Sequence, residues 1–300
     1  MSQGIQQQKA YSLALLAVFF WSTIGSALKI TLRYTSIDGM LLWTVSSGII
    51  VLLIFNQFGK VPLRFKHLSV RALVSSSIMG FFNPFLYYLI LFKAYELLEA
   101  QEASTLNYTW PIVLVLLSIP FLKQKIHWQA ILSVFISFFG IIVISTHGHL
   151  WNLHFSSPLG VLLAVGSALF WAIYWILNMR DKREASAKIL LNLIFGLLYL
   201  VIYFQVIGKW PALPSWQGIL GSVYIGIFEM SITFVIWMQA LNFSRDTAKV
   251  SNLMYLSPFL GLVWIHFAVG EDIRFSTLIG LLFIVGGIVL QRLTDRQISA

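Results

Sequence analysis

Ten apolar runs, each close to twenty residues long, divide the chain and alternate with short polar segments. An apolar run of this length is enough to cross the hydrocarbon core of a bilayer as an α-helix. The pattern therefore predicts an all-α polytopic membrane protein with ten transmembrane helices and few residues left for anything else. The runs lie at residues 11–28, 37–55, 73–92, 103–122, 128–145, 158–177, 190–207, 216–238, 250–269 and 275–290.

Similar motifs recur about 147 positions apart, which indicates a duplicated chain. Residues 106–111 read LNYTWP and residues 253–258 read LMYLSP. The two segments share Leu, Tyr and Pro at matching places. Residues 80–83 match residues 226–229 at an offset of 146. The similar offsets place five predicted helices in each half.

An odd number of helices per half reverses the direction of the second half in the membrane. The sequence thus predicts two inverted five-helix repeats around a central cavity, the architecture of many secondary transporters. We place the first repeat at residues 1–146 and the second at residues 158–300, with a connecting outer loop at residues 147–157.

Two prolines interrupt long apolar runs at equivalent places in the two halves. Pro111 lies in the fourth predicted helix and Pro258 in the ninth. A proline inside a helix removes one backbone hydrogen bond and clashes with the carbonyl four residues earlier, here that of Asn107. Exposed polar backbone in a membrane must face protein or a water-filled cavity. We therefore predict that both prolines are helix kinks beside a binding site.

The basic residues are distributed unevenly between the two sides of the membrane. The chain is 58% apolar and 10% charged with a mean hydropathy of +0.83, far from the composition of soluble proteins, and its net charge is +9. With the N-terminus in the cytoplasm, fifteen of the twenty Lys and Arg residues fall on the cytoplasmic side. This bias predicts a multi-pass protein of the cytoplasmic (inner) membrane with both termini in the cytoplasm, and it explains the positive charge without a nucleic-acid partner.

The sequence contains no pattern typical of an enzyme or a metal site. It has no cysteine, which excludes disulfides and thiolate ligands. The outer loop contains His147, His149 and His154, but it offers no neighbouring carboxylate or thiolate to complete a metal site. No phosphate-binding loop or nucleophile triad can be assembled. We expect no enzymatic activity, no cofactor and no metal.

Glu229 is the one carboxylate that lies well inside a predicted span. Burying an ionised carboxylate in hydrocarbon is costly, so such residues usually face a cavity and bind substrate or carry protons. Glu229 could therefore bind an ammonium group, carry a coupling proton, or hold helices together as a structural residue. Asn83 is its counterpart in the first repeat, and Pro84 directly after it predicts a further kink.

Several aromatic residues lie in the middle of predicted spans, away from the interfaces where Trp and Tyr usually gather. Such residues either line a wet cavity, where their faces bind cations or aromatic groups, or pack between helices. The candidate substrate-binding residues are Trp21, Asn83, Tyr88, Asn107, Tyr108, Trp110, Trp171, Tyr174, Glu229 and Tyr255.

The second half ends with Gly270-Glu271 and Gly286-Gly287, although the first half has Lys123-Gln124 where the second has Gly270-Glu271. With these motifs, the two halves together resemble the EamA-type members of the drug/metabolite transporter superfamily. The motifs at residues 21–23, 107–111 and 170–174 are similar to those of the aromatic amino-acid exporter branch. The resemblance implies a ten-helix basket, export by alternating access, and a cavity lined by these tryptophans and tyrosines.

The leading prediction is a secondary transporter that exports small amphipathic metabolites, most of all aromatic or apolar amino acids, by alternating access. Its partners would be the small-molecule substrate, the lipid bilayer and, if transport is coupled, protons. An exporter of lipophilic cations or drugs is the alternative, and a non-transporting membrane scaffold or sensor is a distant one. The sequence does not specify the oligomeric state, and a monomer would suffice.

Overall fold

The computed structural model describes residues 2–58, 69–110, 112–114, 116–117, 128–150, 157–244, 250 and 253–299, and the elements in these ranges are all helical. The elements are α1 (Ser2–Thr31), α2 (Ile37–Phe58), α3 (Val70–Gly80), η2 (Phe81–Leu86), α4 (Tyr87–Leu97), α5 (Ala100–Asn107), α7 (Trp128–Ser145), α8 (Pro158–Arg180), α9 (Ala185–Ile207), α10 (Trp216–Phe228), α11 (Ile232–Phe243), η3 (Leu253–Leu256), α13 (Ser257–Trp264), η4 (Ile265–Val269) and α14 (Phe275–Ser299).

Six helical stretches are long and apolar enough to cross a membrane by length and composition. Further apolar helices in the described residues are shorter, at 135–144, 253–269 and 275–290, and each coincides with a predicted span. The fourth predicted span lies partly outside the described residues. The six long spans are Gln7–Thr31, Ile37–Gln57, Val70–Leu97, Pro158–Asn178, Ala185–Ile207 and Trp216–Phe243.

The chain forms two compact units, and each unit contains segments from both halves of the sequence. Unit 1 comprises Met1–Leu89 and Asp181–Trp264, and unit 2 comprises Ile90–Arg180 and Ile265–Ala300. The compact units thus differ from the two sequence repeats, whose boundaries remain a prediction.

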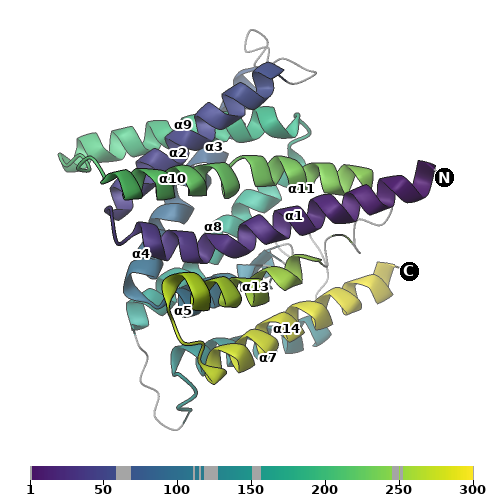
Figure 1. Ribbon diagram of the computed structural model, residues 1–300. Coiled ribbons are helices and arrows are strands. Elements are labelled where there is room, and N and C mark those ends of the chain that lie inside the picture. Colours follow the sequence, from purple (N-terminus) through teal and green to yellow (C-terminus); the bar gives the residue numbers. More distant parts are fainter. Residues whose placement is uncertain are drawn as a thin grey trace. The chain divides into compact units, whose positions relative to one another are not determined.

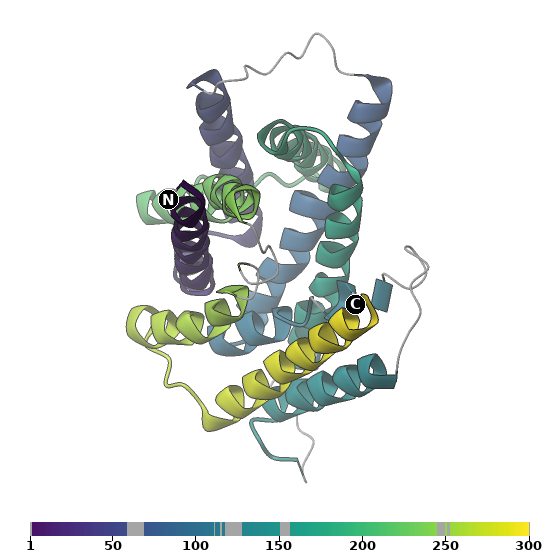
Figure 2. The same ribbon diagram turned by 90° about the vertical axis from the view of Figure 1, so that its right-hand side faces the viewer.

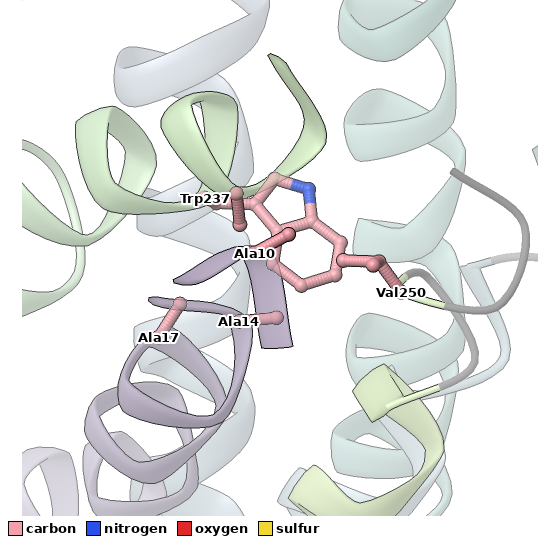
Figure 3. Packing of buried hydrophobic residues seen from close by; sticks show 6 residues of the cluster. Ala10, Ala14, Ala17, Trp237 and Val250 are labelled. Carbon is pink, nitrogen blue, oxygen red and sulfur yellow. The ribbon is translucent and has the colours of Figure 1, made fainter. Parts of the chain in front are cut away.

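In unit 1, α1 runs alongside α10 and α11 (Figure 1). Three buried alanines of α1, at positions 10, 14 and 17, follow the spacing of one helix face and leave a shallow surface. The indole of Trp237 from α11 packs against this surface together with Val250 (Figure 3). Small residues on one helix therefore allow a large residue of its neighbour to approach closely.

Two further helix pairs of unit 1 meet at glycines. Helix α2 packs against α10, where Gly48 lies beside the carbonyl of Gly226, and α3 packs against α9, where Gly80 lies beside Gly196. A Cβ atom at Gly80 or Gly226 would clash with the backbone of the facing helix, so the close approach requires glycine. Gly48 and Gly196 are 148 positions apart and Gly80 and Gly226 are 146 apart, close to the offset of the predicted repeat.

In unit 2, α7 and α14 lie side by side and run in opposite directions (Figure 2). The residues in contact fall in order along α7 and in reverse order along α14. A shift of 147 positions turns the contact 133/287 into the contact 280/140, and it turns the contact 137/284 into itself. The contacts are Ser133 with Gly287, Ser137 with Ile284, whose carbonyl accepts the serine hydroxyl at 3.3 Å, and Gly140 with Gly280.

The third and eighth predicted spans are both interrupted, at positions 146 residues apart in the sequence. Between α3 and α4, η2 is a π-helical turn in which Asn83 has φ −147° and ψ 120°, outside helical values. Between α10 and α11 the chain makes a turn from Glu229 to Ser231. The kink beside Pro84 was predicted from the sequence. The turn at Glu229, which has no proline or glycine, was not.

The described parts of the fourth and ninth predicted spans are also irregular. Helix α5 ends at Asn107, and Tyr108 and Thr109 form a turn before helix resumes at Trp110. Pro111 lies outside the described residues. Pro258 is the second residue of α13, directly after the 3-10 helix η3. At the start of an α-helix the missing N–H of proline removes no helical bond, so the irregular segment precedes Pro258.

Candidate functional site

Four aromatic rings in unit 2 form a cluster, which we call the tryptophan cluster: Trp110, Trp171, Tyr174 and Trp175. The last three lie on one face of α8 because they are three and four residues apart. Trp110 follows the turn after α5, and its ring is stacked on that of Trp175, with centroids 6.4 Å apart and planes 16° apart. It meets Trp171 edge to face, with centroids 6.5 Å apart.

An amide group is fixed beside the tryptophan cluster. The Asn107 side chain donates a hydrogen bond from Nδ2 to Oγ of Ser167, with a length of 2.8 Å. Ser167 lies one helical turn before Trp171 on α8, so Asn107 joins the end of α5 to the same helix that carries most of the cluster. Asn107 and Trp110 are partly exposed. Trp171 and Tyr174 are buried, whereas Trp110 and Trp175 keep some exposed ring surface next to this polar group, which suits an aromatic or apolar side chain on an otherwise polar molecule.

Unit 1 contains a different kind of site at the turn between α10 and α11. Glu229 follows the last residue of α10, and its carboxylate oxygen Oε1 accepts a hydrogen bond of 2.8 Å from the hydroxyl of Tyr88. Tyr88 belongs to α4 and its side chain is buried, whereas Glu229 is partly exposed. We call these two residues the carboxylate pair.

Aromatic residues precede Glu229 on α10 and pack against α1. The ring of Phe228 is stacked on that of Phe20, with centroids 4.3 Å apart. The hydroxyl of Tyr224, one turn earlier, lies 2.6 Å from that of Thr23 on α1. These contacts hold the end of α10 in place directly before Glu229.

The remaining candidates from the sequence make other contacts or are placed only by the element that contains them. The Trp21 ring packs against Phe234 and Trp237 of α11, at 5.5 and 5.6 Å between centroids, which agrees with the helix-packing alternative. Tyr108 forms the C-cap of α5 and Tyr255 belongs to η3. Buried Asn83 lies within η2. Their roles in substrate binding stay predictions, as does the expected absence of a metal.

With the geometry described, comparison with known proteins defines the class of this chain. Residues 8–146 and 158–292 each match the EamA-like transporter family. The chain belongs to this family. It is therefore a multi-pass membrane transporter, and the two matched stretches account for most of its length.

Characterised and uncharacterised transporters are similar to this EamA-family protein along almost their whole length. An uncharacterised transporter of Archaeoglobus fulgidus is 23% identical over 96% of this chain and 99% of its own. The aromatic amino acid exporter YddG of Escherichia coli is 22% identical over 97% of this chain and 99% of its own. A solved structure that covers 96% of this chain and 98% of its own superposes with a TM-score of 0.67 at 21% identity, which supports the fold.

Sequence reasoning missed two features of the EamA-family protein. Trp175 was not among the candidates, although its position four residues after Trp171 places it on the same face of α8. A buried polar network at the start of α5 was also missed, because its charged residues lie at the ends of predicted spans and look like solvated loop residues.

Proposed function

We propose that this EamA-family transporter exports aromatic or apolar amino acids and that the tryptophan cluster binds their side chains. The observation that carries the proposal is the stacking of Trp110 on Trp175 beside the Asn107 amide. Ring faces bind apolar and aromatic groups, and the amide recognises a polar group at the edge of the bound molecule. The similarity to an aromatic amino acid exporter of Escherichia coli supports the same substrate class.

In this proposal Glu229 carries the proton that couples export to the proton gradient. A partly exposed carboxylate inside an apolar span is a common proton carrier in transporters. The Tyr88 hydroxyl donates to the carboxylate and can accept from the protonated acid, so one neighbour can accommodate both forms. The alternative, recognition of the substrate ammonium group by Glu229, predicts a loss of substrate affinity instead of a loss of coupling.

We further propose that the chain comprises two inverted repeats, residues 1–146 and 158–300, that operate by alternating access. The two separate family matches support the repeats. The opposite directions of α7 and α14, whose contacts map onto each other at an offset of 147, support an inverted relation. The excess of basic residues on one side supports a location in the inner membrane with both termini in the cytoplasm.

Counterflow in liposomes tests the proposed substrate class. Vesicles that contain purified protein and unlabelled phenylalanine are diluted into labelled phenylalanine, and the transient accumulation of label is measured. We expect accumulation that unlabelled tryptophan, tyrosine and leucine reduce and that glutamate and lysine do not. Liposomes without protein are the control, and a wild-type protein that accumulates no label contradicts the proposal.

Export of lipophilic cations is the second candidate, because aromatic ring faces also bind cations. The exposed parts of Trp110 and Trp175 are the feature that favours it. Adding tetraphenylphosphonium to the counterflow assay separates the two candidates. Accumulation of labelled tetraphenylphosphonium in the same assay, without any accumulation of phenylalanine, would favour cation export.

A further inference from the structure

The first turn of α5 is capped by a residue that lies 171 positions away in the sequence. The N-cap residue of this helix, Glu99, makes no side-chain cap bond. Instead, the Glu271 carboxylate accepts hydrogen bonds from the backbone N–H groups of Ala100 at 2.9 Å and Gln101 at 3.2 Å. A carboxylate at a helix N-terminus satisfies unpaired N–H groups and interacts favourably with the helix dipole.

Gly270 allows the chain to turn so that Glu271 reaches α5. Its φ of +82° lies in the left-handed region, which favours glycine. Its own N–H donates to the carbonyl of His266 at 3.2 Å, closing the end of η4. The position of the Glu271 carboxylate is thus set by a backbone turn.

The Gln101 side chain makes a second link between the same two segments. Its Nε2 donates to the backbone carbonyl of Asp272 at 3.0 Å. Its Oε1 accepts from the backbone N–H of Arg274 and from the hydroxyl of Thr277, each at 3.0 Å. Gln101 and Thr277 are both 1% exposed, so these bonds are made away from solvent and are costly to leave unmade.

Charged groups surround this link. The Arg274 guanidinium pairs with Glu99 and lies 3.6 Å from Glu102. Glu102 is 2% exposed, and its Oε1 lies 3.0 Å from Nε2 of His147, just after α7. These bonds join Glu271, Asp272, Arg274 and Thr277 to Glu99, Ala100 and Gln101 at the start of α5, and we call them the cap network.

We propose that Glu271 is a positioning residue that, through the cap network, sets where α5 presents Asn107 and Trp110. The proposal rests on the proposed function of the tryptophan cluster. Helix α5 is eight residues long, about 12 Å at 1.5 Å per residue, and carries the cap network at one end and Asn107 at the other. A shift at the capped end is therefore transmitted along a short, regular helix to the Asn107–Ser167 bond and to Trp110.

The cap network positions α5 rather than opening and closing as a gate. All its members belong to unit 2, as do α5 and the tryptophan cluster. A bond inside one compact unit can persist while that unit moves as a body. The buried side chains of Gln101, Glu102 and Thr277 likewise favour a permanent connection, since exposing them would leave polar groups unpaired.

Glu271→Ala in the full-length protein tests this inference with two measurements. The first is hydrogen–deuterium exchange of residues 100–107, which needs no substrate. The second is the Kd for phenylalanine and for tetraphenylphosphonium. We expect exchange to become about tenfold faster and the Kd of the bound probe to rise about fivefold, as the loss of a helix cap implies. Glu271→Gln should give intermediate values, because its one amide oxygen can still accept from the helix.

Asp272→Asn is the matched control, since it removes the same charge from the next residue, whose contact with Gln101 is made by the backbone carbonyl. It should match the wild type in both measurements. Unchanged exchange in Glu271→Ala overturns the cap network, and faster exchange with an unchanged Kd overturns its positioning role. A wild-type protein that binds neither probe contradicts the proposed function, whereas the exchange result still tests the cap network.

Discussion

The tryptophan cluster of unit 2 and the carboxylate pair of unit 1 differ in almost every chemical respect. The cluster is built from four large rings on two helices with an amide beside them. The pair is one carboxylate that accepts a hydrogen bond from one hydroxyl at a helix interruption. Rings recognise shape and apolar surface, while a carboxylate exchanges a proton. The difference teaches that recognition and coupling can be assigned to separate units and therefore tested by separate variants.

The largest expected effect comes from Glu229→Gln, which keeps the shape of the side chain but cannot carry a proton. Coupling free energies between two sites are typically 1–3 kcal/mol, so we expect net export driven by a pH gradient to fall by about 10- to 100-fold. Counterflow of phenylalanine, which needs no net proton movement, should stay within about twofold. A raised KM for counterflow would instead assign Glu229 to the substrate ammonium group.

Trp110→Ala should weaken substrate recognition and leave coupling intact. Removing a stacked ring costs about 1.5 kcal/mol, so we expect the KM for phenylalanine to rise roughly tenfold. Trp216→Ala is the matched control, because Trp216 is 68% exposed at the start of α10, outside the cluster. An equal rise in KM for both variants would remove the tryptophan cluster from the site.

Asn107→Ala should also weaken substrate recognition, but it should raise the KM less than Trp110→Ala does. It removes the bond to Ser167 and an amide beside the rings, and one hydrogen bond contributes about 1 kcal/mol, or roughly fivefold in KM. Ser167→Ala, which removes the partner but keeps the amide, should cost less. If the two variants are equally impaired, Asn107 acts only by holding α5 to α8.

Tyr88→Phe tests the carboxylate pair with a smaller chemical change than Glu229→Gln. Losing the hydroxyl removes the hydrogen bond to Glu229, so gradient-driven export should fall by about threefold to tenfold, as for one ordinary hydrogen bond of about 1 kcal/mol. The KM for phenylalanine should not change. Tyr87→Phe, at the neighbouring position, is the control, and an effect limited to KM would contradict the assignment of the pair to coupling.

The smallest expected effect concerns stability at His147, beside the cap network. Burial first, and then the positive charge of Arg274, lower the pKa of His147 below its ordinary value, although Glu99 acts in the opposite direction. The unfolded chain therefore binds the proton more readily, and stability should fall as the pH drops below about 6.5.

His147→Gln should flatten this part of the pH profile. We expect it to reduce the acid-induced loss in unfolding temperature by about 2 °C, measured in detergent between pH 5.5 and 8. His149→Gln, at an exposed position, is the comparison and should change the profile less, because His149 is the smallest contributor to the lowered pKa of His147. A wild-type protein that becomes more stable on acidification over this range would contradict the assignment.

Much of the fold could be predicted from the sequence because membrane helices depend on long apolar runs. The interruption at Pro84 followed from proline chemistry, but the turn at Glu229 did not, because it depends on packing against α1 and on the Tyr88 bond. Trp21 and Trp110 look alike in sequence. Only the structure separates them, since Trp21 packs against α11 and Trp110 joins the cluster.

Long-range polar contacts could not be predicted from the sequence. Glu271 and Ala100 are separated by 171 positions, and no periodicity relates them. Charged residues near span ends, such as Glu102 and Arg274, usually face solvent or headgroups, so their meeting in one network could not be expected. Only an arrangement of helices in space brings such groups together.

The most direct test of the division between recognition and coupling is substrate-driven proton movement in liposomes, recorded with an internal pH indicator after phenylalanine is added. We predict proton movement with the wild type, the same number of protons per phenylalanine with Trp110→Ala at a higher half-saturating concentration, and none with Glu229→Gln although counterflow persists. Proton movement that survives in Glu229→Gln, or a changed proton-to-phenylalanine ratio in Trp110→Ala, would contradict it.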